Sequence, residues 1–130
     1  EQQYRRAVFN VIGRNHDDHV KNIAYLMNKR GEWRLSPAFD VAYSYNPTGA
    51  WTSRHQMSLN GKRDGFALDD LVALARSGDV KRTKAIAILE EVDSAVGRWR
   101  SFAAEAGVAE ETAQKIEHAQ RRLGTLGDGA

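Results

Sequence analysis

The chain has 130 residues, a length that suits one domain or part of one. Hydrophobic residues make up 42% and charged residues 28%, so the chain can build a core and is not expected to be disordered. The formal net charge is only +2, a balance that does not indicate nucleic-acid binding. Cysteine is absent, which excludes disulfides and a Cys-ligated zinc site.

Targeting signals are missing from the sequence as well. No apolar run approaches the roughly 20 residues of a membrane span, and the start has no signal-peptide pattern. We therefore expect no membrane partner and a cytoplasmic location, with which the lack of cysteine is compatible.

Helical spacing of apolar residues near the start predicts a first helix over residues 2–12, ended by Gly13. This stretch, EQQYRRAVFNVIG, lacks an initiator Met and lies within a helical pattern from its first residues. We therefore expect the chain to have been cut from a longer protein.

A β-hairpin is predicted after the first helix. Residues 22–28 and 32–40 flank the short segment KRG, in which Gly31 can adopt the positive φ of a tight turn. Pro37 should end the second strand because it has no N–H to donate. Residues 43–66 are interpreted as an irregular segment with one short strand at 56–59.

Three helices are predicted in the last half of the chain. The first starts at Leu68 and ends at Gly78, and the second is capped by Asp79 and ends at Gly107. Gly97 lies inside this second helix at a cost of about 1 kcal/mol relative to alanine, which suggests close packing.

The third helix covers about 109–123, with Thr112, Ile116, Ala119 and Leu123 on one face, and the tail GTLGDGA is expected to fray. The expected fold class is α+β and mainly helical, with one β-hairpin and a three-helix C-terminal bundle. We divide it into residues 1–66 and 67–130 of one continuous domain.

The polar segment RNHDDHVKN, residues 14–22, has three possible interpretations. It could be a polar turn that satisfies carbonyls at the end of the first helix. It could be a zinc site using His16 and His19, but zinc needs further ligands, and the remaining histidines, His55 and His118, have no recognisable spacing. We interpret His55 as a loop residue before the short strand.

The third interpretation is a kinase-type catalytic loop, in which a catalytic Asp precedes a Mg²⁺-binding Asn by five positions. Asp17 and Asn22 have this spacing, whereas Asp18 does not. A second metal-binding Asp should follow a hairpin that returns the chain to the site, and Asp40 occupies that position. Two departures from the kinase pattern are that His16 lies one residue before Asp17 rather than two, and that Asp40 is not followed by Phe-Gly.

The segments NHDDHVKN, WRLSPAFDV and HQMSLNGK, followed by a helical tail, resemble the C-terminal part of HipA-like serine/threonine kinases. The resemblance covers roughly residues 5–125 and implies a partial kinase-like C-terminal lobe. These kinases are the toxins of bacterial toxin–antitoxin pairs and use ATP and Mg²⁺ to phosphorylate protein hydroxyl groups. The resemblance implies targets that include aminoacyl-tRNA synthetases. It also implies a helix-turn-helix antitoxin as partner, with DNA contacted only through that antitoxin.

The same resemblance implies roles for five residues. Asp17 would be the catalytic Asp, and Asn22 and Asp40 would be the Mg²⁺ ligands. Lys21 and His19 are the candidates for cofactor binding: Lys21 could contact phosphate or lie near it, and His19 would support the loop.

A complete kinase needs parts that this sequence does not contain. It has no glycine-rich phosphate loop and no strand-borne Lys that precedes a helical Glu. We therefore expect the isolated chain to have no measurable phosphotransfer activity. The alternative function is a non-catalytic module whose C-terminal helices dock an antitoxin or another DNA-binding partner.

Overall fold

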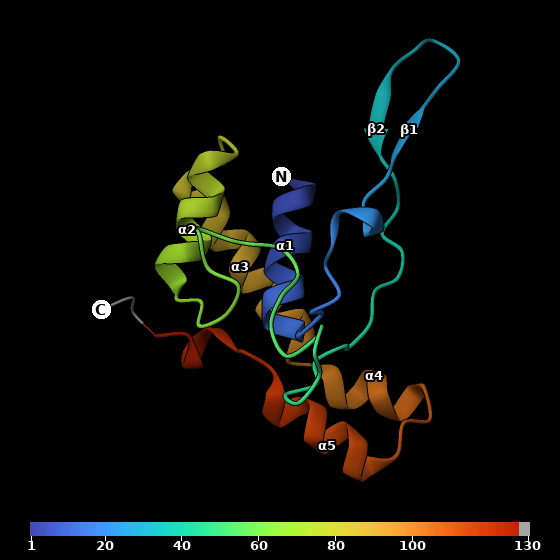
Figure 1. Ribbon diagram of the computed structural model, residues 1–130, viewed down its shortest axis with the longest axis vertical. Coiled ribbons are helices and arrows are strands. Elements are labelled where there is room, and N and C mark those ends of the chain that lie inside the picture. Colours follow the sequence, from blue (N-terminus) through green and yellow to red (C-terminus); the bar gives the residue numbers. More distant parts are fainter. Residues whose placement is uncertain (128–130) are drawn as a thin grey trace.

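The computed structural model describes residues 1–127, which form an α+β fold with one antiparallel hairpin, as expected (Figure 1). The helices and strands follow one another along the chain as α1 (Gln2–Gly13), η1 (Val20–Asn22), β1 (Tyr25–Met27), β2 (Trp33–Leu35), α2 (Leu68–Ser77), α3 (Arg82–Val96), α4 (Trp99–Glu105), α5 (Glu110–Ala119) and η2 (Leu123–Thr125).

The hydrophobic core lies between α1, α2 and α3. Helix α3 packs against both α1 and α2, because each of the three helices has one apolar face. Helices α4 and α5 pack on each other, at the end of the molecule opposite the hairpin (Figure 1). The expected group of C-terminal helices is therefore arranged in two parts, and the core bundle includes the N-terminal helix. The largest fully buried apolar side chains are Val8, Val11, Ile12, Leu59, Leu71, Ile88 and Leu89.

The first helix forms as predicted and leads directly into the polar segment. Gly13 is its last residue, and the left-handed conformation falls on Arg14, with φ 60° and ψ 39°. The Arg14 N–H donates to the Asn10 carbonyl and so closes the helix. This turn reverses the chain and directs residues 15–22 back along α1.

The predicted hairpin is present with strands of three residues each. Tyr25 pairs with Leu35 and Met27 with Trp33, and Gly31 takes a φ of 79° in the connecting turn. The second strand ends at Leu35, before Pro37, as expected. The strand predicted at 56–59 is wrong: its only ladder contact in the described part of the chain is an isolated bridge of Leu59 with Lys62.

The long second helix predicted for the C-terminal half is broken at Gly97 and Arg98 into α3 and α4. A Cβ atom on Gly97 would lie only 2.6 Å from Nη2 of Arg122, so the close packing expected at this glycine is confirmed. The cap predicted at Asp79 is wrong, because Lys81 precedes the first helical residue and Asp79 has a φ of 54°.

The end of the chain is more ordered than predicted. Helix α5 ends at Ala119, and its buried residue is Ala113 rather than the exposed Thr112. Of the tail expected to fray, Leu126 is buried and the Gly127 carbonyl accepts the Leu68 N–H at 3.3 Å. Residues 128–130 of that tail lie outside the described residues.

Within residues 1–127, none of the helices combines the length and the apolar character needed to cross a lipid bilayer.

Candidate active site

A pocket of about 610 Å³ opens between α1, the polar segment and α3. Its wall includes Asp17, His19, Asn22 and Asp40, four of the five candidates from the sequence. Lys21 is exposed and is not among the lining residues. The pocket therefore collects oxygen-bearing side chains from two segments, one before the hairpin and one after it.

The side chain of Asn22 connects these two segments. Its Nδ2 donates to the backbone carbonyl of Asp17 at 3.0 Å and to Oδ2 of Asp40 at 3.0 Å. The 3-10 turn η1 brings Asn22 back over Asp17, and the hairpin returns the chain to Asp40. Asp17, Asn22 and Asp40 therefore line one pocket and are joined through the Asn22 amide nitrogen.

The backbone of Asp40 is strained. Its φ of 51° lies in the left-handed region, which costs energy for a residue with a Cβ atom. Strain of this kind persists only where the surrounding structure enforces it, and it is often found at functional sites. In this conformation the Asp40 carboxylate accepts a hydrogen bond from Asn22.

The segment before Asp40 is tied to α1. Arg6 donates from Nη2 to the Ser36 carbonyl at 2.5 Å, and Ser36 is buried. The backbone N–H of Ser36 donates to the Ala24 carbonyl at 2.8 Å, so the return from the hairpin is fixed on both sides.

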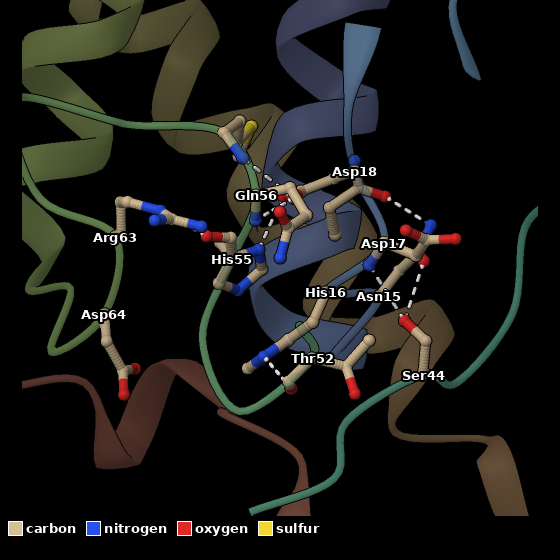
Figure 2. A network of polar contacts seen from close by, with 12 residues as sticks. Asn15, His16, Asp17, Asp18, Ser44, Thr52, His55, Gln56, Arg63 and Asp64 are labelled. Carbon is tan, nitrogen blue, oxygen red and sulfur yellow. Dashed lines mark hydrogen bonds and ion pairs between the residues drawn. The ribbon is translucent and has the colours of Figure 1, made fainter. Parts of the chain in front are cut away.

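The backbone of Asp17 is also fixed. Its N–H donates to Oγ of Ser44 at 3.0 Å, and that hydroxyl in turn donates to Oδ1 of Asn15 at 3.2 Å (Figure 2). The Asp17 side chain remains 45% exposed, with Oδ1 3.4 Å from Nε2 of His19. Asp17 is therefore held by its main chain and presents its carboxylate to the pocket.

Asp18 is the residue that sequence reasoning missed. Its side chain is only 1% exposed, and it accepts three hydrogen bonds from residues 55–57 (Figure 2). Oδ2 accepts from Nδ1 of His55 at 2.5 Å, and Oδ1 accepts the N–H groups of Gln56 and Met57 at 2.8 and 3.1 Å. Asp18 lacks the spacing of a catalytic Asp, and its only signal in the sequence is its position next to Asp17.

His55 lies outside the helices and strands, as expected, but its side chain is not that of an exposed loop residue. The ring is fully buried and lies between His16, at a centroid distance of 4.0 Å, and Phe66, at 5.2 Å. The His55 N–H donates to the Arg63 carbonyl at 3.0 Å, and Nε of Arg63 donates to the His55 carbonyl at 2.7 Å. No sequence spacing could have linked His55 to Asp18, 37 positions away.

His16 is buried beside His55 and is not positioned as a metal ligand. Its Nδ1 lies 3.0 Å from the Thr52 carbonyl. Burial lowers the pKa of His16 to about 4, assisted by the nearby His55, Arg14 and Arg121. His16 is therefore neutral at physiological pH.

A zinc site of the kind considered for the polar segment is not formed. Across residues 1–127, no group of three or more His, Cys, Asp or Glu side chains is placed to hold a metal ion. The donors in the pocket, the Asp40 carboxylate and the Asn22 amide, are instead oxygen ligands of the type that Mg²⁺ accepts. Mg²⁺ commonly binds to one or two protein groups and completes its shell with phosphates and water, and this donor set fits that pattern.

Comparison with known proteins gives one family match. The model of the HipA-like C-terminal domain matches residues 1–120, which is most of the chain. No curated protein and no solved structure matches it.

Proposed function

Because the chain belongs to the HipA-like C-terminal domain family, we propose that it forms the catalytic-loop half of an ATP-dependent protein serine/threonine kinase. The observation that carries this proposal is the common pocket of Asp17, Asn22 and Asp40, with Asn22 bonded to both aspartates. Asp17 and Asn22 precede the hairpin, and Asp40 follows it. Protein kinases have the catalytic Asp, the Mg²⁺-binding Asn and the second Mg²⁺-binding Asp in the same order along the chain.

In the proposed reaction, Asp17 orients the hydroxyl of a substrate Ser or Thr and accepts its proton at the carboxylate. The exposed half of its side chain leaves room for a substrate. The Asp17 N–H is bonded to Ser44 and its carbonyl to Asn22, so its main chain is already ordered before substrate binds. Less conformational entropy is then lost when the catalytic carboxylate is positioned for reaction.

Asn22 and Asp40 would hold the Mg²⁺ that accompanies ATP. The two amide hydrogens of Asn22 are engaged with Asp17 and Asp40, and its amide oxygen is the atom with which an Asn binds a cation. When bound, Mg²⁺ would neutralise negative charge on the β- and γ-phosphates of ATP. The hydrogen bond from Asn22 Nδ2 to Oδ2 holds the Asp40 carboxylate for this role.

The wider role follows from the family and is part of the same proposal. The complete protein would be the toxin of a toxin–antitoxin pair, with a helix-turn-helix antitoxin as partner and aminoacyl-tRNA synthetases as the substrate class. It would work in the cytoplasm, where ATP is supplied. His19 would support the loop through its contact with Asp17, whereas the exposed position of Lys21 offers less support for phosphate binding.

The test uses Asp40→Asn in the full-length protein and Asp79→Asn as its matched control. Both are exposed aspartates with positive φ, 51° and 54°, and Asn tolerates that conformation. Of the two, only Asp40 lines the pocket. Transfer of labelled γ-phosphate to protein should fall by at least about 100-fold in D40N and stay unchanged in D79N.

Undiminished transfer by D40N would refute the assigned role. The purified 130-residue chain, assayed in the same way, should show no transfer, and stoichiometric transfer would contradict that expectation.

A further inference from the structure

The pocket is built next to a buried network that its proposed chemistry does not use. This network consists of Asp18, His55 and the backbone N–H groups of Gln56 and Met57. We propose that Asp18 and His55 are positioning residues that set the orientation of the Asp17 carboxylate. The inference rests on the proposed kinase function and adds to it.

The strength of the network comes from its burial. Both side chains are at most 1% exposed, so no water competes for their hydrogen bonds. A carboxylate only accepts hydrogen bonds, so His55 carries its proton on Nδ1 and donates it to Asp18. Bonds of this kind to an ionised group are about twice as strong as neutral ones. Breaking one inside the protein also leaves a buried polar atom unpaired.

His55 is a rigid reference point for this bond. Its backbone is paired in both directions with Arg63, and its ring is packed between His16 and Phe66. Asp18, by contrast, belongs to an irregular segment between α1 and η1. The position of that segment is therefore set by the segment around His55 and not by secondary structure of its own.

The connection to Asp17 is direct because the two aspartates are neighbours. The Asp18 side chain is buried, whereas the Asp17 side chain is half-exposed and lines the pocket. A rotation of the backbone that moved Asp18 would move the Asp17 carboxylate with it. The contacts of Asp17 with Ser44 and Asn22 hold its main chain, and the bonds of Asp18 hold the next residue along the chain.

The network also reaches the wall of the pocket. Met57 donates its N–H to Asp18 and lines the same pocket as Asp17. Asp18 thus fixes Asp17 on one side and Met57 on the other.

The experiment uses two substitutions at His55 in the full-length protein. Asn at position 55 can place an amide N–H near the position of Nδ1, and Leu has a similar size but no donor. If the Nδ1 bond positions Asp17, H55L should lower kcat by roughly 10- to 100-fold, because a shift of about 1 Å in a catalytic group can cost this much. KM for ATP should change by less than about threefold, and H55N should recover most of the lost kcat.

Asp70→Asn serves as the control for stability alone. Asp70 is also buried and accepts three hydrogen bonds, from Ala67, Asn60 and Lys62, but it caps α2 and does not line the pocket. D70N should lower the urea midpoint of unfolding and leave kcat unchanged. If H55L does not fold, Asp18→Asn replaces it. The Asn oxygen still accepts both backbone N–H groups, an amide nitrogen replaces the oxygen that accepts the His55 Nδ1–H, and the same fall in kcat is expected.

The outcomes separate this inference from the function on which it depends. A wild-type protein with no phosphotransfer activity would reject the proposed function and the positioning role together. An active wild type with unchanged kcat in folded H55L, or in D18N if H55L does not fold, would reject the positioning role alone. The positioning role is also rejected if folded H55N loses as much kcat as H55L.

Discussion

The buried imidazole of His16 makes the stability of this fold sensitive to acid. Its ring is completely shielded from solvent and packs against His55 and Tyr45, with centroid distances of 4.0 and 4.9 Å. Burial lowers its pKa to about 4, and the positive charges of Arg14 and Arg121 act in the same direction. In the unfolded chain the same side chain has the ordinary histidine pKa of about 6.5.

The sign of the effect follows from these two values. Between pH 6.5 and 4 the unfolded chain binds a proton at His16 that the folded chain does not, so acidification favours unfolding. The contribution of neutral His16 is complete above pH 6.5 and is lost as the pH falls toward 4. Each pH unit in this window costs about 1.4 kcal/mol, so a change from pH 7 to pH 5 should remove about 2 kcal/mol.

Urea unfolding followed by circular dichroism at pH 7 and pH 5 measures this loss, with His16→Phe for comparison. Phe keeps a ring in contact with His55 and Tyr45 but cannot titrate. It also loses the contact with the Thr52 carbonyl, so H16F should be less stable at pH 7. Between the two pH values its free energy of unfolding should fall by about 2 kcal/mol less than that of wild type. Equal losses in both proteins would show that His16 is not the group responsible.

Two further predictions concern packing. Leu89→Ala, in the core face of α3, should lower the free energy of unfolding by about 2–5 kcal/mol, whereas Val20→Ala, at a side chain 81% exposed, should change it by less than about 0.5 kcal/mol. If chemical denaturation gave similar losses of unfolding free energy for Leu89→Ala and Val20→Ala, the assigned core would be contradicted. Gly97→Ala should push the Arg122 guanidinium away from Asp93, with which it makes two hydrogen bonds. In a double-mutant cycle, Asp93→Asn should then cost about 1–2 kcal/mol in wild type and clearly less in G97A, and equal costs would disprove the clash.

Local patterns were sufficient to predict much of the fold. The apolar spacing of α1 and α2 predicts these helices because each buries one face, and that face is visible in the order of residues. Gly31 and the two segments that flank it predict the hairpin from local sequence as well. Two of the site residues, Asp17 and Asn22, are also close enough in the chain for their spacing to carry information.

Other features depend on residues that are far apart in the chain. The break between α3 and α4 occurs where Arg122 packs against Gly97, and no helical pattern around residue 97 contains that contact. The inclusion of α1 in the core with α2 and α3 likewise results from packing across the whole chain.

The candidate site shows the same division. The sequence shows that Asp17 precedes the hairpin and that Asp40 follows it, because order along the chain does not depend on folding. The burial of Asp18 against His55 cannot, because the two residues are 37 positions apart, with a hairpin and irregular chain between them. The sequence by itself determined the order and spacing of Asp17, Asn22 and Asp40 along the chain. Only the tertiary structure decided that the Asp18 side chain is buried against His55 while that of Asp17 stays 45% exposed, because burial and hydrogen bonding depend on neighbours that folding brings together.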